Sequence, residues 1–399
     1  MKINNVNELI VKYNDEVVGY LKELKDKRIA FQYSKSWIKN GFSISPLSLP
    51  LNDEIFISQS KYFNGLFGVF NDSLPDGWGE LLFRRMLVKN GINIEKLSSL
   101  TRLSFVNSSS LGALRYYPIN YNENENLDFD LDKLYIESSK IFKDENVNDL
   151  DYVYKFGGSS GGARPKVHIK HNNEEWIVKF SCSYDPVEAG VEEYKINELA
   201  KKCDINVNEF KLFKSRTNKG YFGCKRFDRE DKSIHMISLS SLLETTHKIP
   251  NLDYSHLFQV IRIICNDEEE LYEAFKRMCF NVLIGNKDDH GRNFSFLYDE
   301  KKKSYVLSPF YDITETPFKL EHEMTVNNSG NPSKEDIFII AKKFELNLEK
   351  CESIYNKIEK IIETRSLEQG FFFLIVVDFK STKEYNCWWG VTYEGIFRK

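Results

Sequence analysis

Short alternating runs of apolar and polar residues dominate the first third of the chain, and this pattern predicts half-buried β-strands. Residues 1–20 alternate as one strand, and 28–34 (RIAFQYS) alternate as another. A stretch rich in Gly, Pro and Asp follows, and then 77–91 (GWGELLFRRMLVKNG) has the apolar spacing of a helix. Residues 119–150 are acidic and rich in Asn, so we expect a linker there that carries one helix.

The middle of the chain predicts two pairs of strands with one helix between them. A Gly/Ser-rich turn precedes the first pair, and 191–203 (VEEYKINELAKKC) has helical spacing. The four strands are predicted at 166–171, 175–180, 209–215 and 221–228. From about residue 232 to 283 the pattern becomes helical. Strands on both sides of one helix, followed by helices, are an α+β order and not the alternating order of a doubly wound sheet.

A polar loop between an apolar helix and a hairpin is expected to bring three polar side chains together. The helix pattern ends near Gly285, because glycine readily takes the left-handed conformation that stops a helix. Residues 294–312 contain two alternating runs joined by the charged turn EKKK, which predicts a hairpin. Asn293, before the first strand, should therefore lie beside Asp312, after the second. Asp288 stands in the loop that precedes both of them.

The predicted cluster of two carboxylates and one amide suits Mg²⁺, which keeps several positions for water and phosphate. In protein kinases the catalytic Asp precedes a metal-binding Asn by five positions, and a second metal-binding Asp follows the next hairpin. Asp288, Asn293 and Asp312 have this arrangement, so the sequence predicts a kinase that uses ATP and Mg²⁺. The alternative is an ordinary solvated turn, in which Asp and Asn are also common.

The Gly-rich segment 157–164 (GGSSGGAR) imitates the start of a P-loop. Ala163 and Arg164, however, occupy the positions where a P-loop has Lys and Ser or Thr, and a hairpin rather than a helix follows. We therefore disfavour a P-loop. A Gly-rich turn whose main-chain amides donate to phosphates is compatible with the pattern, and a flexible linker turn is the alternative.

Lys179 lies within the apolar strand EWIVKF, where it either extends its amino group past the sheet edge or contacts a phosphate. In the second case a carboxylate must hold the ammonium group, and Glu193 on the next predicted helix is the candidate partner. Glu192 is its immediate neighbour, so spacing alone leaves the choice between the two open.

The composition limits the class of protein. A chain of 399 residues is long for a single core, so we expect two or more domains. A net charge of −4 excludes a large basic surface for nucleic acid. The seven Cys form no CxxC or Cys/His cluster, which indicates a reducing cytoplasm and no zinc site. The longest apolar run, 371–377, is too short to cross a bilayer, so we expect a cytoplasmic protein without membrane contact.

Five segments of the chain, in order, resemble the HipA family of bacterial serine/threonine kinases, which act as toxins in toxin–antitoxin pairs. They are 63–83 (FNGLFGVFNDSLPDGWGELLF), 157–167 (GGSSGGARPKV), 225–229 (KRFDR), 284–296 (IGNKDDHGRNFSF) and 307–313 (LSPFYDI). In the family these are the signature of an N-terminal subdomain, the Gly/Ser loop, the hinge, the catalytic loop and the metal-binding segment. The similarity extends from about residue 30 to 350.

The resemblance implies a protein-kinase-like two-lobed fold of the α+β class, with a β-rich ATP lobe, a helical C-lobe and an extra N-terminal α+β subdomain. The boundaries we expect are 1–118 for the N-terminal HipA-type subdomain, 119–150 for the linker, 151–231 for the ATP-binding lobe and 232–365 for the catalytic lobe. Residues 366–399 are aromatic and strand-like and fall outside the resemblance. They are a divergent tail, a partner-binding segment or a chain end altered by a frameshift.

The resemblance also assigns roles to single residues. Asp288 would be the catalytic Asp, and Asn293 and Asp312 would bind Mg²⁺. The residues around ATP would be Gly161, Gly162, Ala163, Arg164, Lys166, Lys179, Lys225, Phe227, Asp228, His290, Arg292, Asn293, Tyr311 and Asp312.

Within that set, the hinge residues have separate roles. Lys225 and Phe227 would meet adenine through main-chain atoms, and Asp228 would lie near the ribose. The family's inhibitory autophosphorylation matches Ser159 best, with Ser160 as the adjacent alternative. A phosphate there would add roughly two negative charges beside the ATP phosphates and should expel the loop.

For function, the resemblance implies transfer of the ATP γ-phosphate to a Ser/Thr hydroxyl of a protein such as an aminoacyl-tRNA synthetase, which would arrest translation and growth. It also implies a HipB-like antitoxin partner with a helix-turn-helix, through which DNA would be contacted only indirectly. Two other classes stay open. One is an ATP-binding but inactive regulatory module of an antitoxin–operator complex, and the other is a small-molecule or lipid kinase.

Overall fold

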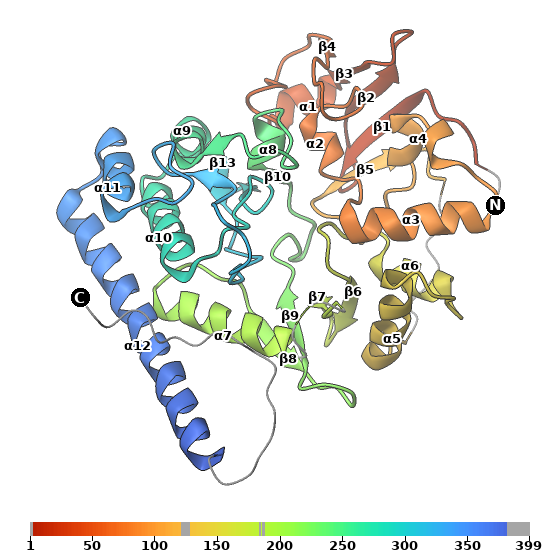
Figure 1. The fold of residues 1–399 in the computed structure, drawn as a ribbon. Helices are drawn as coiled ribbons and strands as arrows, with labels where there is room; N and C mark the ends of the chain where they lie inside the picture. Colours follow the sequence, from red (N-terminus) through yellow and green to blue (C-terminus); the bar gives the residue numbers. More distant parts are fainter. Residues whose placement is uncertain (1–2, 121–127, 183–184, 186–187, 381–399) are drawn as a thin grey trace.

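The computed structural model describes residues 3–120, 128–182, 185 and 188–380. They form an N-terminal sheet with short helices, a second sheet beside one long helix, and a helical lobe (Figure 1). The α+β class predicted from the order of the elements is therefore confirmed.

The N-terminal sheet has five strands in the order β4-β3-β2-β1-β5. Its strands are β1 (Glu8–Tyr13), β2 (Glu16–Glu23), β3 (Ile29–Tyr33), β4 (Phe56–Ile57) and β5 (Leu114–Tyr117). The single strand predicted over residues 1–20 is wrong, because the chain turns at Asn14 and pairs with itself. Asn14 takes the left-handed φ of 50°, which Asn tolerates better than most residues.

Helices surround this sheet and lead to the second one. They are α1 (Lys35–Asn40), α2 (Gly68–Asn71), α3 (Gly77–Lys89), α4 (Ser99–Leu103), α5 (Leu131–Phe142) and α6 (Leu150–Gly157), with a 3-10 turn at Ile94–Lys96. The helix predicted at 77–91 is α3, and the one predicted in the linker is α5. Leu134 of α5 is buried with Val167 and Val178 of the second sheet, so α5 is a packed element and not a solvated connector.

The second sheet contains the four strands that the sequence predicts in the middle of the chain. Its order is β6-β7-β9-β8, and α7 (Ala189–Lys202) packs against it. The strands are β6 (Lys166–His171), β7 (Glu174–Lys179), β8 (Phe210–Phe213) and β9 (Tyr221–Lys225). The β6–β7 register sets Lys166 opposite Lys179, so two lysines lie at the same end of the hairpin, next to the Gly-rich turn.

The helical lobe carries the predicted hairpin. The lobe consists of α8 (Leu239–Leu242), α9 (Tyr254–Ile264), α10 (Glu269–Ile284), α11 (Lys334–Lys343) and α12 (Leu348–Lys380), with strands β10 (Met236–Ser238), β11 (Leu252–Asp253), β12 (Ser295–Asp299), β13 (Ser304–Leu307) and β14 (Met324–Thr325). β12 and β13 pair in antiparallel register, which confirms the hairpin. The prediction that residues 232–283 are helical is wrong at β10, which pairs with β12 as a strand. The sequence did not indicate this strand because three residues are too few to show a period.

The end of the chain departs from the expected pattern. Residues 366–380, which look strand-like, continue helix α12 to Lys380. β-propensity is a weak local preference, and here a helix already anchored against α10 and α11 extends into that segment. Residues 381–399 lie outside the described residues. In the part of the chain that the structure describes, no helix is long and apolar enough to cross a membrane.

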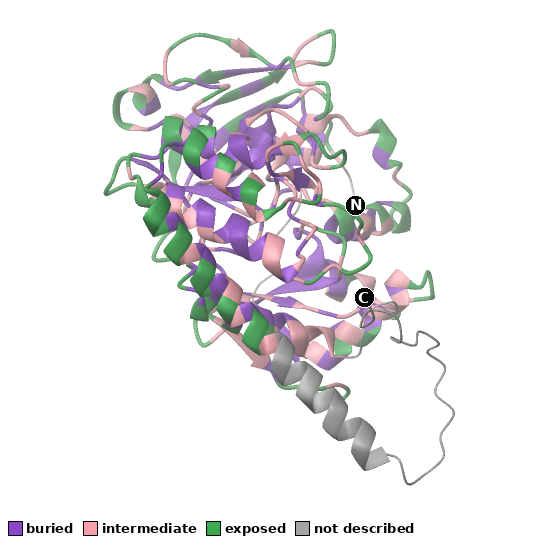
Figure 2. Cartoon of the chain, turned by 60° about the vertical axis from the view of Figure 1, so that its left-hand side comes forward, coloured by how far each residue is buried: buried purple, intermediate pink, exposed green. Residues whose placement is uncertain are grey.

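The N-terminal unit and the helical lobe share one hydrophobic core. Buried residues run from β1–β3 through α9 and α10 to α12. Figure 2 shows that buried residues, in purple, fill the interior of the molecule. At their contact Phe42 stacks on Tyr298, with ring centroids 3.6 Å apart, and Tyr13 donates to Glu300 at 2.8 Å. The N-terminal unit is thus packed onto the lobe over an extensive apolar surface.

Glu244, after α8, gives this contact a pH dependence. Its two carboxylate oxygens accept the Gly68 N–H, each at 3.0 Å, and burial raises the pKa of Glu244 to about 7. The folded state therefore favours the protonated acid, and stability falls as pH rises from about 4.5 to 7. Glu244→Gln should add roughly 1–3 kcal/mol to the unfolding free energy at pH 8 and much less at pH 5. Urea unfolding at both pH values measures the change in unfolding free energy, and an equal increase at pH 5 and pH 8 would contradict the prediction. Glu16→Gln, at an exposed site, is the control.

Candidate active site

A cavity of about 780 Å³ lies between the second sheet, the N-terminal unit and the loop after α10. Its volume is within the range of roughly 300–1,000 Å³ that is common for ligand sites. The lining includes Asp288 and all the predicted nucleotide residues, namely Gly161, Gly162, Ala163, Arg164, Lys166, Lys179, Lys225, Phe227, Asp228, His290, Arg292, Asn293, Tyr311 and Asp312. The fold therefore gathers at one place residues that lie as much as 151 positions apart in sequence, from Gly161 to Asp312.

The two adjacent carboxylates of the catalytic loop have different surroundings. Asp289 has no exposed side-chain surface; it accepts the Tyr254 hydroxyl at 2.9 Å and lies 2.9 Å from His322 Nδ1. Asp288 has 43% of its side chain exposed and lines the cavity. Asp289 thus anchors the loop in the core, and Asp288 is presented to the cavity.

Asn293 and Asp312 carry oxygen atoms of the kind that Mg²⁺ binds. The Asn293 amide donates to the main-chain oxygen of Asp288 at 2.7 Å, which leaves its Oδ1 as a ligand atom. Asp312 has a φ of 52°, a left-handed conformation that costs free energy in a non-glycine residue and is often found at functional sites. An amide oxygen and a carboxylate on the same cavity wall fit Mg²⁺.

Lys179 joins the sheet to this oxygen cluster. Its ammonium group forms ion pairs with both Glu193 and Asp312, whereas Glu192 pairs with Lys195 at 2.7 Å. The ambiguity between the two glutamates is resolved by the geometry of α7. Burial alone would raise the pKa of Asp312, but the neighbouring lysine charges outweigh it and hold the pKa below its ordinary range.

The Gly-rich turn is docked on the N-terminal end of α3. The Trp78 N–H donates to the Gly162 carbonyl at 2.8 Å, and a Cβ at Gly77 would collide with the same carbonyl. Arg164 points to Asp185, with 2.8 Å between the groups. The turn is therefore a fixed structure whose residues Gly161, Gly162 and Ala163 line the cavity, and not a flexible linker turn.

Asp76 is a site residue that the sequence did not single out. It stands at the N-cap position of α3 but makes no capping bond to its own helix. Its carboxylate instead accepts the Gly162 N–H and pairs with Arg292, which also lies 3.5 Å from Asp72. The N-terminal unit thus reaches into the cavity, and Arg292, predicted to face phosphate, already has carboxylate partners. Asp76 lies in the segment 63–83 that carries the family resemblance, but an Asp before a helix is ordinarily only a cap.

Three ring side chains line the cavity together with Arg292, namely His290 of the loop after α10, His247 and Tyr311. The His290 ring lies 5.2 Å from that of His247, which follows α8, and burial lowers the pKa of His247 to about 4. Tyr311 donates its hydroxyl to the Arg292 carbonyl at 2.6 Å. Tyr311 therefore fixes the loop backbone, and His247 is a second contributor that the sequence did not indicate.

The hinge residues Lys225 and Phe227 line the cavity at the end of β9. Lys225 has its main-chain N–H bonded to the Glu209 carbonyl at 2.8 Å, and its own carbonyl accepts the Asn208 amide at 2.6 Å. The Phe227 ring lies 5.4 Å from the Tyr311 ring. The position suits a flat base, and the adenine contacts stay a prediction.

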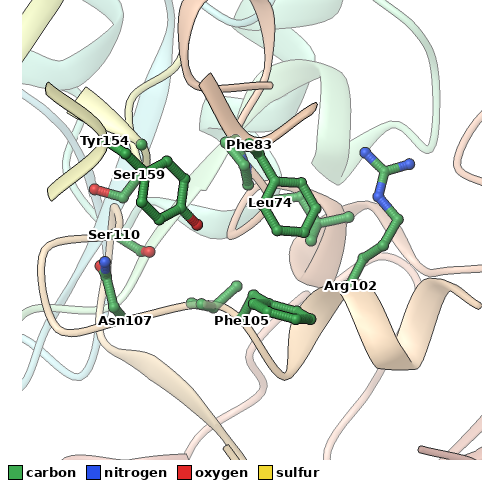
Figure 3. Close-up of a pocket in the computed structure, with 11 residues that line it drawn as sticks. Leu74, Phe83, Arg102, Phe105, Asn107, Ser110, Tyr154 and Ser159 are labelled. Atoms are coloured by element: carbon green, nitrogen blue, oxygen red, sulfur yellow. The ribbon is translucent and has the colours of Figure 1, made fainter. Parts of the chain in front are cut away.

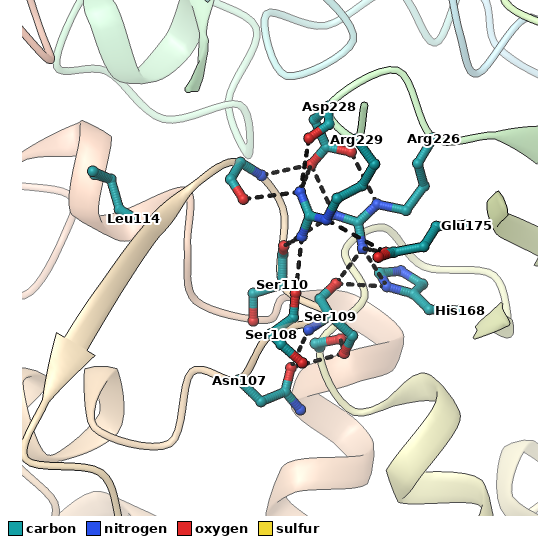
Figure 4. A network of polar contacts seen from close by, with 12 residues as sticks. Asn107, Ser108, Ser109, Ser110, Leu114, His168, Glu175, Arg226, Asp228 and Arg229 are labelled. Atoms are coloured by element: carbon teal, nitrogen blue, oxygen red, sulfur yellow. Dashed lines mark hydrogen bonds and ion pairs between the residues drawn. The ribbon is translucent and has the colours of Figure 1, made fainter. Parts of the chain in front are cut away.

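Asp228, predicted near the ribose, is the centre of a buried ionic network (Figure 4). One of its oxygens accepts from Arg226 at 2.7 Å, from Arg229 at 2.9 Å and from the Gly112 N–H at 2.7 Å. The two guanidinium groups also bind the carbonyls of Ser108–Ser110. Because these contacts occupy the carboxylate, a ribose contact would require it to exchange partners.

The two candidate serines face away from the cavity. Ser159 is buried and shares a 2.6 Å hydrogen bond with Ser109, beside a crevice of about 10 Å³ that holds at most one water molecule. Figure 3 shows Ser159 next to Tyr154 and Ser110 at that crevice. Ser160 is fully buried and donates to the Gly157 carbonyl. Neither hydroxyl can accept a phosphate unless the turn leaves its position on α3.

Two family models match the chain. The HipA N-terminal domain matches residues 9–117, and the HipA-like C-terminal domain matches residues 158–365. The two matched ranges leave out the segment that contains α5 and α6.

Similar proteins and structures agree with these models. "Putative kinase Y4dM" of Sinorhizobium fredii is 23% identical over 367 residues, which cover 86% of this chain and 87% of that protein. Serine/threonine-protein kinase CtkA of Helicobacter pylori is 27% identical over 176 residues, which cover 39% of this chain and half of CtkA. A solved structure of the Shewanella oneidensis toxin–antitoxin system HipA, HipB and its operator DNA aligns with a TM-score of 0.69 at 19% identity, over 90% of each chain. This likeness shows that the fold is the HipA fold.

Proposed function

The chain belongs to the HipA family, and on that basis we propose that it is an ATP- and Mg²⁺-dependent serine/threonine protein kinase. The observation that carries the proposal is the convergence of Asp288, Asn293, Asp312 and the Lys179–Glu193 pair on one cavity. These are the parts that phosphoryl transfer requires, since it depends on positioning and on the neutralisation of phosphate charge.

Each residue then has a defined task. Lys179, held by Glu193, orients the ATP phosphates, and Asn293 and Asp312 hold Mg²⁺, which neutralises phosphate charge when bound. Asp288 accepts the proton of the acceptor hydroxyl as that oxygen bonds to the γ-phosphorus. The bond between the γ-phosphorus and the bridging oxygen breaks, and ADP leaves with the electron pair.

The acceptor that we propose is a protein, such as an aminoacyl-tRNA synthetase, whose phosphorylation would arrest growth. Phe318 and Leu320 support a protein acceptor, because their side chains are 96% and 86% exposed on the segment that follows Asp312. The two residues flank Lys319, which lines the cavity, and exposed apolar side chains at such a place are typical of a protein-binding surface. The HipA of Shewanella oneidensis is solved with HipB and operator DNA, which supports a HipB-like antitoxin as partner and indirect DNA contact.

Incubation of the full chain with Mg²⁺ and ATP, followed by intact-mass and peptide mass spectrometry, tests the proposal. We expect one added phosphate on Ser159 or Ser160, and phosphate on a purified synthetase, neither of which should appear with EDTA. Because both serines are buried, self-phosphorylation should be slower than transfer to the synthetase. Binding of ATP without any transfer would instead indicate the inactive regulatory module. Transfer to small alcohols but to no protein would indicate a small-molecule kinase.

A further inference from the structure

Lys319 reaches the catalytic carboxylate from a segment to which no role has been assigned. Its ammonium group contacts Asp288 Oδ1 and lies 2.7 Å from Glu323 Oε1. Lys319 also lines the cavity, together with Asp288 and Asp312. Burial lowers the pKa of Lys319, but the carboxylates of Asp288 and Glu323 outweigh it and raise the pKa, so Lys319 is a cation at neutral pH.

Main-chain hydrogen bonds hold this lysine in place. The Lys319 N–H donates to the Thr316 carbonyl at 3.0 Å, and the Thr316 N–H donates to Gly285 at 3.1 Å. Lys287, one residue before Asp288, donates its N–H to the Thr316 hydroxyl at 2.7 Å and its ammonium to the Leu320 carbonyl at 2.9 Å. The segment is therefore attached to the catalytic loop itself, so Lys319 moves with Asp288.

Two other cations of the cavity are held by other carboxylates. Lys179 is paired with Glu193 and Asp312, and Arg292 is paired with Asp76. In the described part of the chain, Lys319 is the one cation that contacts Asp288.

A phosphate must come close to this lysine if the proposed reaction takes place. Asp288 has to lie within about 3 Å of the acceptor hydroxyl, and that oxygen has to lie about 3–3.5 Å from the γ-phosphorus. The γ-phosphate oxygens then lie within reach of the Lys319 ammonium group, which is carried on a flexible four-carbon side chain. Without a cation there, the negative charges of Asp288 and the γ-phosphate would repel each other and oppose the approach.

We propose that Lys319 is a catalytic residue that contacts the γ-phosphate of ATP during transfer while Asp288 accepts the proton. This inference rests on the proposed function and deepens it. It identifies the Lys319 ammonium as the positive charge that stabilises the transferred phosphate on the side of the acceptor hydroxyl. The contact with Asp288 seen here is then the resting position of Lys319.

Binding and rate measurements on Lys319→Met and Lys319→Arg test this inference. The affinity for Mg²⁺ with ADP and with a non-hydrolysable ATP analogue is measured by calorimetry, and the rate by phosphate transfer. For Lys319→Met we expect about tenfold weaker binding of the ATP analogue and unchanged binding of ADP, because only the analogue has a γ-phosphate. Turnover should fall roughly a hundredfold, and Lys319→Arg should recover part of both losses. Lys301→Met, in an exposed turn, is the charge-matched control.

The possible outcomes separate the inference from the proposed function. Faster transfer by Lys319→Met would show that the lysine only blocks Asp288, and an equal loss of ADP and analogue binding would show a purely structural role. The inference would also be overturned if Lys319→Met kept the wild-type transfer rate and the wild-type ratio of the affinities for the ATP analogue and ADP. In all three cases the kinase assignment would stand. If the wild-type chain binds neither nucleotide, the proposed function fails and the inference fails with it.

Discussion

In the Asp288→Asn variant we expect a turnover rate about a thousandfold lower than that of the wild-type chain, with nearly the same affinity for ATP. Asparagine has almost the same shape as aspartate but cannot accept the proton of the acceptor hydroxyl. The side chain is 43% exposed and lies at the cavity wall, so among the described residues the only ion pair that the change removes is the part-buried one with Lys319. Initial rates of phosphate transfer and calorimetric affinities for Mg²⁺ with ATP measure the two quantities.

Asp289→Asn is the matched control for this prediction. Its carboxylate has no exposed surface and holds Tyr254 and His322, so its loss should lower the unfolding free energy by roughly 1–3 kcal/mol. Turnover per folded molecule should change far less than in Asp288→Asn. A comparable loss of turnover in both variants would contradict the distinction between a catalytic and an anchoring carboxylate.

The core of the site was predictable because local periodicity alone determines it. A hairpin that starts after Asn293 and ends before Asp312 must return to its origin, and the structure has this hairpin as β12 and β13. The strand and helix periods likewise predicted that Lys179 would pair with a glutamate of the next helix. Only the packing of α7 shows that this partner is Glu193 and not Glu192.

The contributions of the N-terminal unit were not predictable in this way. Asp76 and Arg292 are 216 positions apart, and no periodicity relates residues that meet only through tertiary packing. The same holds for Lys319, which follows Asp312 in an irregular segment without a repeating pattern. Strand β10 was missed because its three residues are defined by their partner β12 and not by their own sequence.

The buried network around Asp228 joins the N-terminal unit to the second sheet. Arg226 is fully buried and Arg229 nearly so, and together they attach Ser108–Ser110, which precede β5 of the N-terminal unit, to the end of β9. Burial alone would raise the pKa of Asp228, but the two guanidinium charges outweigh it and hold the pKa well below its ordinary range. The network therefore fixes the N-terminal unit, which carries Asp76, relative to the sheet that carries Lys179.

Replacement of Asp228 by Ala should lower the unfolding free energy by about 3–5 kcal/mol at pH 7, because it leaves two buried guanidinium groups without their shared carboxylate. Since folding lowers the pKa of Asp228, its contribution is complete above the ordinary carboxyl pKa near 4 and is lost as the pH falls below that value. The difference between wild type and variant in urea unfolding should thus shrink in acid, whereas Asp231→Ala, at an exposed position, should have little effect at any pH. A small loss for Asp228→Ala, combined with a large rise in the KM for ATP, would contradict the structural role and restore the ribose contact.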